Sequence, residues 1–378
     1  MAKCKKYCND KDGTRLNKVG GQAVLEGVMM KAGSRTVTTC RKDNGTLVVN
    51  DAEFHSVRKK HKILNIPILR GVVNMIEMLA LSYKTLGASA DALDLDDGKK
   101  KEDGKESATV TVIMIISMIL GVALSIGLFI VLPGLVTELV ELIFGDISPT
   151  WEAVIEGVSK VLIFLSYLFL VGLVPDIKRT FMYHGAEHKS IACFESGSEL
   201  TPANAKKYIR FHPRCGTSFM FIMILIGVAV GMIINNAFPE LGRAYLILIR
   251  IGILPLVIGI GYEFIMFAGK HDNAFTRALS APGLWVQRLT TKEPTEDMLE
   301  VAIVSIKCAL RDEFPEFREF YENREWEPKV EEEVTEQTAE ETAEEATLEI
   351  TEEATLEITE EATEEAIPKE EKTNDEVL

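Results

Sequence analysis

Four long apolar blocks dominate the pattern of hydrophobic and polar positions along the chain. The first, Thr109 to Leu132, contains no charged residue and is long enough to cross a hydrocarbon core of about 30 Å. The others extend from about Ala153 to Val174, from Thr217 to Ile234 and from Ala244 to Ala268. The pattern therefore predicts a mostly α, polytopic membrane protein with about four transmembrane helices.

Charged residues inside such blocks need partners. Glu156 and Lys160 lie four residues apart in the second block, on one helix face, where they can pair. Glu263 lies near the end of the fourth block and must meet a metal, a cation from another segment or a proton. Arg250 lies on another face of the same helix, so we expect its side chain to extend toward the outer interface instead.

Basic residues near the ends of the blocks predict the orientation. Four lysines precede the first block, whereas the segment from Pro133 to Glu152 has no basic residue. The loop between the second and third blocks is rich in Lys and Arg, and the connection between the third and fourth offers only Arg243. We therefore expect a multi-pass protein of the cell (cytoplasmic) membrane, with both termini and the central loop in the cytoplasm.

The N-terminal segment has the pattern of a small α+β domain. Arg35 to Arg41 and Thr46 to Asn50 are β-rich runs joined through Asp43-Asn44-Gly45, which favours a hairpin turn within a meander from about Ala23 to Val57. Asn65 to Ala88 has a helical pattern that polar residues interrupt, which favours an interfacial or protein-buried helix. This domain and a charged linker are expected to occupy residues 1–108.

Composition separates the body of the chain from its end. The 378 residues are 47% hydrophobic, with a mean hydropathy of +0.11 and a formal net charge of −16. Residues 331–378 contain 20 acidic residues against two lysines, and the sequence ATLEITEE occurs there twice in succession. We therefore expect four regions: the N-terminal domain, a transmembrane region over 109–268, a helical cytoplasmic segment over 269–328 and a disordered acidic tail over 329–378. Since no basic aromatic surface is evident, nucleic acid is not an expected partner.

Candidate chemistry lies between the second and third blocks, in the loop 175–216. His184-Gly-Ala-Glu187-His188 has the His-x-x-Glu-His spacing typical of inverted zincins. On a helix, residues i and i+4 share a face, so both imidazoles can bind one metal, and Glu187 can take a proton from a water molecule there. With six His among 378 residues, this motif is rarely expected by chance. In the alternative interpretation the histidines are interfacial, and Glu187 neutralises Lys189 or Arg179.

A tight zinc site needs at least three protein ligands. The further candidates are His212, Cys215 and Glu263. A site closed by His184, His188, His212 and Cys215 would leave no position for water and would be structural. Three ligands beside a free Glu187 would favour catalysis.

Five separated motifs resemble the YqhQ family of bacterial membrane proteins. They are Gly20 to Met30, Arg70-Gly71, Tyr183 to Lys189, His212 to Phe219 and Pro282 to Thr291. The resemblance, over about residues 20 to 310, implies a membrane topology and a metal-dependent enzyme of unknown function. It also implies importance for the first of these motifs (Gly20, Gly21, Gln22, Glu26 and Gly27), whose glycines would let a strand approach another backbone closely.

Two functions from different classes fit these features. One is a membrane metallohydrolase with zinc as the expected divalent metal and Glu187 as the catalytic residue, which cleaves a peptide or a lipid-linked substrate at the cytoplasmic interface. The other is a non-catalytic scaffold that binds a membrane-protein partner. In that case the same residues form a structural metal site or a polar network. In both cases the lipid bilayer is the surrounding partner.

Overall fold

The computed structural model describes residues 15, 18–93, 108–212, 215–238, 240–270, 274–317 and 325–326. The chain divides into two units, Met1–Glu327 and Pro328–Leu378. The expected acidic tail and most of the charged linker therefore lie outside the described residues. The elements named below all belong to the first unit.

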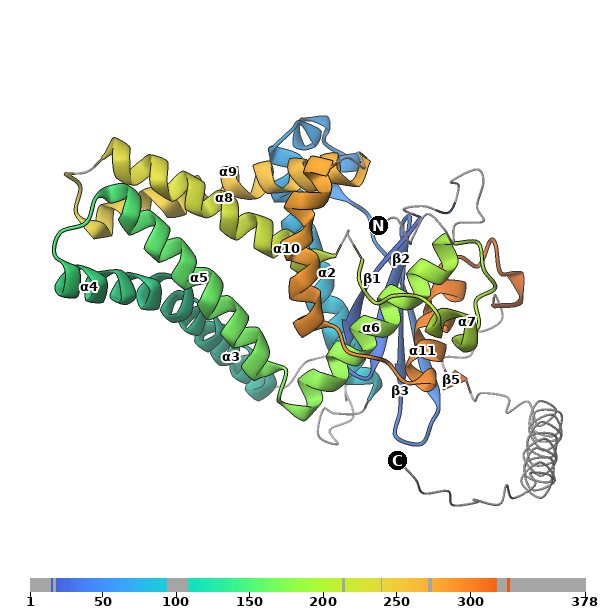
Figure 1. Ribbon diagram of the computed structural model, residues 1–378. Coiled ribbons are helices and arrows are strands. Elements are labelled where there is room, and N and C mark those ends of the chain that lie inside the picture. Colours follow the sequence, from blue (N-terminus) through green and yellow to red (C-terminus); the bar gives the residue numbers. More distant parts are fainter. Residues whose placement is uncertain are drawn as a thin grey trace, which may run out of the picture. The chain divides into compact units, whose positions relative to one another are not determined.

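An antiparallel sheet forms the N-terminal part (Figure 1). Its strands lie side by side in chain order: β1 (Val19–Val24), β2 (Gly27–Ala32), β3 (Arg35–Arg41), β4 (Leu47–Glu53) and β5 (Glu325–Trp326). The predicted turn between β3 and β4 is confirmed, since Gly45 has a φ of +86° and the Thr46 N–H donates to Asn44 Oδ1 at 3.0 Å. The predicted meander begins at about Ala23 and so misses most of β1. This strand contains Gly20 and Gly21, and glycine has a low strand propensity.

Helices cover both faces of this sheet. On one face, α6 (Pro175–Glu195) and α11 (Glu296–Ala309) share a core with Val28, Met30 and Val37. On the other, Leu81 of α2 (Leu69–Ala92) packs with a smaller cluster on the first three strands. The core therefore joins parts of the chain from before, between and after the apolar blocks. The short helices are η1 (Val57–Lys59), η2 (Lys62–Asn65), α7 (Pro202–Lys206) and η4 (Pro315–Phe317).

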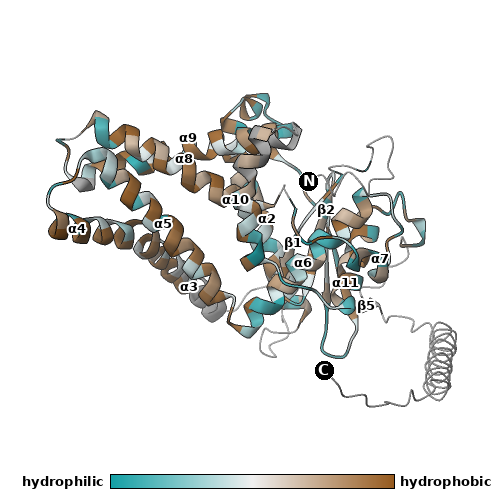
Figure 2. Ribbon diagram, viewed as in Figure 1, coloured by the Kyte–Doolittle hydropathy of each residue, from teal (hydrophilic) through white to brown (hydrophobic). Residues whose placement is uncertain are grey.

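Four described helical segments are long and apolar enough to span a membrane, as predicted. They are Ile119–Phe144, Pro149–Val171, Phe219–Ala237 and Tyr245–Phe267. The corresponding elements are α3 (Ala108–Ile126), the π-helical turn η3 (Gly127–Val131), α4 (Leu132–Phe144), α5 (Pro149–Val171), α8 (Gly216–Ala237) and α9 (Arg243–Lys270), with α10 (Ala274–Thr290) after them. Figure 2 shows mostly hydrophobic residues along α4, α5, α8 and α9, whereas α6 contains many hydrophilic residues.

The first span extends further than predicted. We expected a loop from Pro133 to Glu152, but the helix continues to Phe144, and only four residues separate α4 from α5. Pro133 is accommodated because it lies in the first turn of α4, directly after the π-helical turn that changes the hydrogen-bond register.

Three charged residues of α5 and α9 form a cluster inside the bundle. The predicted pair is confirmed, since Lys160 Nζ lies 2.7 Å from Glu156 Oε1. Arg250 contradicts the prediction: it donates to the same oxygen at 2.5 Å and to Asn235 Oδ1 at 3.0 Å instead of extending outward. Neutralisation inside the bundle is favoured because an isolated charge there is costly.

Helix α2 packs against α9 through two glycines. A Cβ atom on Gly71 would lie 2.6 Å from Cβ of Tyr262, and one on Gly259 would lie 2.3 Å from Cγ2 of Ile68. This contact places Arg70 Nε 2.6 Å from Glu263 Oε1. Of the three partners that we considered for Glu263, the structure therefore provides a cation from another segment.

Candidate metal centre

The His-x-x-Glu-His motif lies on a helix, as its spacing requires. Helix α6 begins at Pro175 and continues through the motif to Glu195. The side chains of His184 and His188 are adjacent on one face, with their ring centroids 4.4 Å apart. The helix itself is therefore suited to present two imidazoles to one ion.

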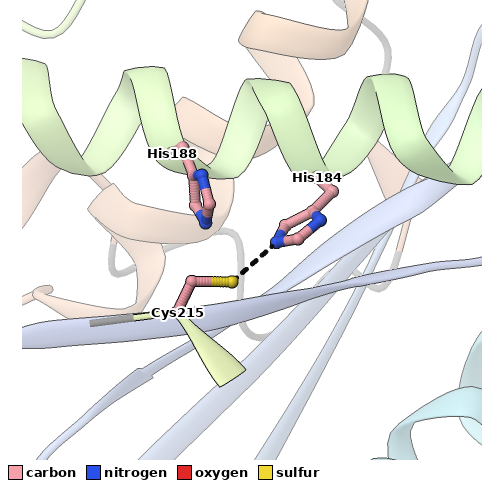
Figure 3. Close-up of side chains that lie close together, drawn as sticks. All are labelled: His184, His188 and Cys215. Carbon is pink, nitrogen blue, oxygen red and sulfur yellow. Dashed lines mark hydrogen bonds between the residues drawn. The ribbon is translucent and has the colours of Figure 1, made fainter. Parts of the chain in front are cut away.

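Cys215 lies opposite the two histidines, at the N-terminus of α8 (Figure 3). Its Sγ is 3.2 Å from His184 Nε2. One ligand atom from each of the three residues can be chosen so that all lie within 4.8 Å of one another. Two nitrogens and one sulfur thus converge from segments that are far apart in the sequence.

The other ring nitrogens fix the orientation of both imidazoles. His184 Nδ1 lies 2.9 Å from the Thr290 carbonyl oxygen, and His188 Nδ1 lies 2.6 Å from the Arg210 carbonyl oxygen. A carbonyl only accepts, so both Nδ1 atoms must carry the proton. Each Nε2 then presents a lone pair, which is the arrangement that metal-binding histidines adopt.

Gly185 allows the segment that contains Thr290, the carbonyl partner of His184, to approach α6 closely. A Cβ atom on residue 185 would lie 2.1 Å from the Lys292 carbonyl oxygen. The Lys292 N–H donates to the Phe181 carbonyl at 2.8 Å, which holds the segment after α10 against α6. The glycine inside the motif is therefore required by packing.

Glu187 borders the cluster and is buried, with 5% of its surface exposed. Its Oε2 lies 3.9 Å from His184 Nε2. Burial raises the pKa of Glu187 to about 7, against the opposing effects of His184 and of a hydrogen bond from the Gly21 N–H. A Cβ atom on Gly21 would lie 3.0 Å from Glu187 Cγ, so the strand approaches as closely as its glycines suggested.

His212 lies beside the cluster without belonging to the group of three. Its ring centroid is 5.6 Å from that of His188, and its Nε2 is 3.7 Å from Glu195 Oε2. Gln287, wholly buried, holds the His212 backbone by two hydrogen bonds, at 2.8 Å to its N–H and 2.7 Å to its carbonyl. No pattern of residue types in the sequence points to Gln287 itself, although it lies within the Pro282–Thr291 motif.

Glu263, the remaining candidate ligand, is not brought to the cluster. Its carboxylate accepts hydrogen bonds from Arg70 and, at 3.3 Å, from the Ile68 N–H at the start of α2. It therefore joins α2 to α9, while the metal candidates that the structure gathers are His184, His188 and Cys215.

The alternative pairing of Glu187 with Lys189 or Arg179 is wrong. Lys189 bonds Glu293 instead. Arg179 donates at 2.6 Å to Glu26, which lies in the β1–β2 turn with a φ of +45°. Glu26 thereby ties the sheet to α6; the family resemblance implied importance for this residue but did not indicate this contact.

The donor set fits a zinc ion. Bond lengths of about 2.0–2.1 Å to nitrogen and 2.3 Å to sulfur place tetrahedral ligand atoms about 3.3–3.6 Å apart. The observed separations, from 3.2 Å up to at most 4.8 Å, require shifts on the order of 1 Å. Three ligands would leave one tetrahedral position for water or substrate.

Comparison with known proteins identifies the family. The family model described as "Protein of unknown function (DUF1385)" matches residues 66–312. The chain is also 34% identical, over 303 residues, to the "Uncharacterized protein YqhQ" of Bacillus subtilis (strain 168), which covers 77% of this chain and 92% of the relative. The chain belongs to the DUF1385 family. The resemblance to YqhQ is thus confirmed, and the His184, His188 and Cys215 cluster lies within the segment that the DUF1385 model matches. No solved structure matches the chain.

Proposed function

We propose that the protein is a metal-dependent hydrolase that acts at the membrane interface, with zinc held by His184, His188 and Cys215. One observation carries this proposal: both imidazoles commit Nδ1 to a backbone carbonyl and direct Nε2 toward the same thiol. If the two histidines bound no metal, nothing would require both of them to adopt the same tautomer opposite a cysteine.

The cluster has the composition of a catalytic zinc site. Zinc would supply a Lewis acid that polarises the bond to be cleaved and lowers the pKa of water. Glu187 is the group that accepts the proton from the attacking water and returns it to the leaving group. The Gly21 N–H, which donates to the Glu187 carboxylate, holds the side chain in place for this task.

The proposed location of the cluster is the cytoplasmic face of the cell membrane, with both chain termini in the cytoplasm. The excess of Lys and Arg between the second and third spans supports this orientation. Zinc-binding cysteine is also compatible with a reducing compartment, since the thiol there does not form a disulfide.

A structural metal site in a scaffold is the second candidate, and His212 is the observation that favours it. Its ring lies beside that of His188, 5.6 Å between centroids. Rotation of this ring would add a fourth ligand and close the position that substrate needs. In that case Glu187 would support the fold without transferring a proton.

Zinc quantitation and complementation on the same variants separate the two functions. We expect about one zinc per full-length chain in detergent, little in His184→Ala, and a full complement in Glu187→Gln, whose amide cannot accept the proton. Glu187→Gln should then fail to complement a deletion strain. The control is His55→Ala, which changes an exposed histidine that contacts Glu53 and should retain both zinc and function.

Full complementation by Glu187→Gln, with zinc bound, would contradict catalysis and support the scaffold. Wild-type protein that contains no zinc after purification from zinc-replete cells would contradict both forms of the site.

A further inference from the structure

A cavity of about 670 Å³ lies among α2, α5, α8 and α9, together with η3. This volume is within the range of about 300–1,000 Å³ that small-ligand pockets occupy. Its walls are mostly apolar and include the thioethers of Met75, Met78, Met220 and Met223. Flexible methionines suit a surface that must adapt to an apolar ligand.

The cavity begins beside the candidate metal centre. Gly216, which lines it, directly follows Cys215 in the chain. On the opposite wall, the Ser82 hydroxyl donates to Gln22 Oε1 at 2.5 Å, and Gln22 adjoins Gly21, whose N–H bonds Glu187. The candidate ligand Cys215 is thus one residue from the lining, and Glu187 is connected to it through Gly21, Gln22 and the lining residue Ser82.

From there the cavity follows α8 into the membrane-spanning region. The lining residues Gly216 and Val230 are 14 residues apart on α8, which corresponds to about 21 Å along the helix. Several lining residues, Leu79, Met220 and Leu254 among them, are at least half exposed, so the cavity is open to the exterior of the spans. The cavity therefore borders the surface that the bilayer would cover.

The charged lining residues lie far from the metal centre and are already paired. Glu156 accepts from both Lys160 and Arg250, and Arg250 lies against Gly231 near the other end of α8. These contacts neutralise the charges at this end of the cavity, and among the buried polar atoms of Glu156, Lys160 and Arg250 only Arg250 Nε has no hydrogen-bond partner. An apolar chain can pass along the remaining wall.

The dimensions exclude a transmembrane helix as the occupant. A helix of 20 residues is about 30 Å long and 10–12 Å wide, so it would need a volume on the order of 2,400 Å³ or more. An extended peptide would bring unpaired backbone groups to an apolar wall, at a cost of several kcal/mol for each group. A hydrocarbon chain meets neither obstacle.

From these relations we infer that the cavity holds the hydrocarbon chain of the substrate, whose polar group lies at the cluster of His184, His188 and Cys215. The substrate class is a membrane lipid with a hydrolysable polar group. This inference rests on the proposed hydrolase function, since it assigns the substrate of the same site.

Two glycine substitutions provide a matched test. Gly227 lines the cavity, and Gly252 lies on α9 outside the lining; an added Cβ at either position meets no atom within 4 Å. Gly227→Trp should fill the cavity, whereas Gly252→Trp should project its ring elsewhere. Neither residue contacts the metal ligands, so both variants should retain the zinc content of the wild type.

The probe is a phosphatidylglycerol with a photoreactive diazirine at the middle of one acyl chain, presented in vesicles of phosphatidylglycerol and phosphatidylethanolamine. Illumination followed by peptide mass spectrometry should label Met223 and its cavity neighbours in the wild type. We expect Gly227→Trp to reduce this labelling at least fivefold and Gly252→Trp to leave it unchanged. Labelling of the outward-facing Ile119 and Leu120, both more than half exposed, reports ordinary contact with the bilayer.

Cavity labelling that is no stronger than labelling at Ile119, or that Gly227→Trp leaves unchanged, would overturn the inference. If Gly227→Trp does not fold, Gly227→Leu serves in its place, and excess unlabelled phosphatidylglycerol must compete with the probe at Met223. Zinc measured on the same preparations keeps the two proposals separate: absence of zinc would contradict the hydrolase, and absence of cavity labelling with zinc bound would contradict only the lipid assignment.

Discussion

Gly185 and Lys292 approach so closely that a Cβ atom on residue 185 would lie 2.1 Å from the Lys292 carbonyl oxygen. Two residues earlier, the Thr290 carbonyl accepts from His184 Nδ1 at 2.9 Å. The glycine therefore lets the segment that carries the carbonyl partner of His184 lie against α6. The same short segment links α10 to α11, so the packing of the helices after the spans is connected to the cluster.

We predict that Gly185→Ala weakens zinc binding at least tenfold, because the segment after α10 must move away and His184 loses its carbonyl partner. Competition with a chelator of known affinity measures the loss. The control is Gly87→Ala, in α2, where an added Cβ meets nothing within 4 Å and zinc affinity should not change. Equal affinities for the Gly185→Ala variant and the wild type would show that this carbonyl does not support the metal site.

Zinc should protect Cys215 from alkylation. Of the four described cysteines, all free thiols, Cys40, Cys193 and Cys308 are buried, and burial raises the pKa of Cys40 to about 12 and of Cys193 to about 11. N-ethylmaleimide should therefore modify Cys215 fastest among these four in chelator-treated protein, and zinc should slow the reaction at least tenfold. Peptide mass spectrometry locates the modification. Equal rates with and without zinc would exclude Cys215 as a ligand.

The sequence contained the periodic features of this fold but not its long-range contacts. The four spans, the turn at Gly45 and the helix that presents His184 and His188 follow from local patterns. The convergence of Cys215 on the two histidines does not, because 27 residues separate it from His188 and its position depends on how α8 begins.

The ion-pair partners of Arg250 and Glu263 could not be predicted from the sequence. The position of Arg250, on another face of α9 than Glu263, predicts that its side chain extends to the outer interface, yet Glu156 of α5 is in reach once the helices pack. For Glu263 the sequence permits three kinds of partner, and the cation that it meets, Arg70, lies almost 200 residues away. Helix periodicity gives the face of a side chain but not the neighbour that this face meets.

Accessibility from the two sides of the membrane tests the proposed orientation. Asp43, in the β3–β4 turn, and Asp146, between α4 and α5, are both exposed, so cysteine at either position should not disturb the core. In intact cells, a membrane-impermeant maleimide should label Asp146→Cys and not Asp43→Cys; permeabilisation should make both accessible. Labelling of Asp43→Cys in intact cells would reverse the assignment of the cytoplasmic side.

The pH dependence of stability should reveal the burial of Glu187. Its pKa is raised from 4.5 to about 7 by burial, so the folded state holds the proton between these values while the unfolded state releases it. For this group, stability is therefore lost as the pH rises through that interval. In metal-free protein, Glu187→Gln should gain thermal stability relative to wild type between pH 5 and pH 8. Glu199→Gln, at an exposed position, is the control, and a pH-independent difference for Glu187→Gln would contradict the shift.

The ion pair between Arg70 and Glu263 should stabilise the packing of α2 against α9 and should not affect metal binding. Arg70→Gln and Glu263→Gln should each reduce the free energy of unfolding in detergent by on the order of 1–3 kcal/mol, since each leaves one partly buried charge without its partner. The double variant should lose clearly less than the sum of the two, because neither charge remains. Lys59→Gln, which alters an exposed cation, should instead be additive with Glu263→Gln. Zinc content should be that of the wild type in every variant. Loss of zinc from Glu263→Gln alone would return this carboxylate to the candidate ligands. Additive losses in the free energy of unfolding for the Arg70 and Glu263 variants would show that the pair does not couple the two helices.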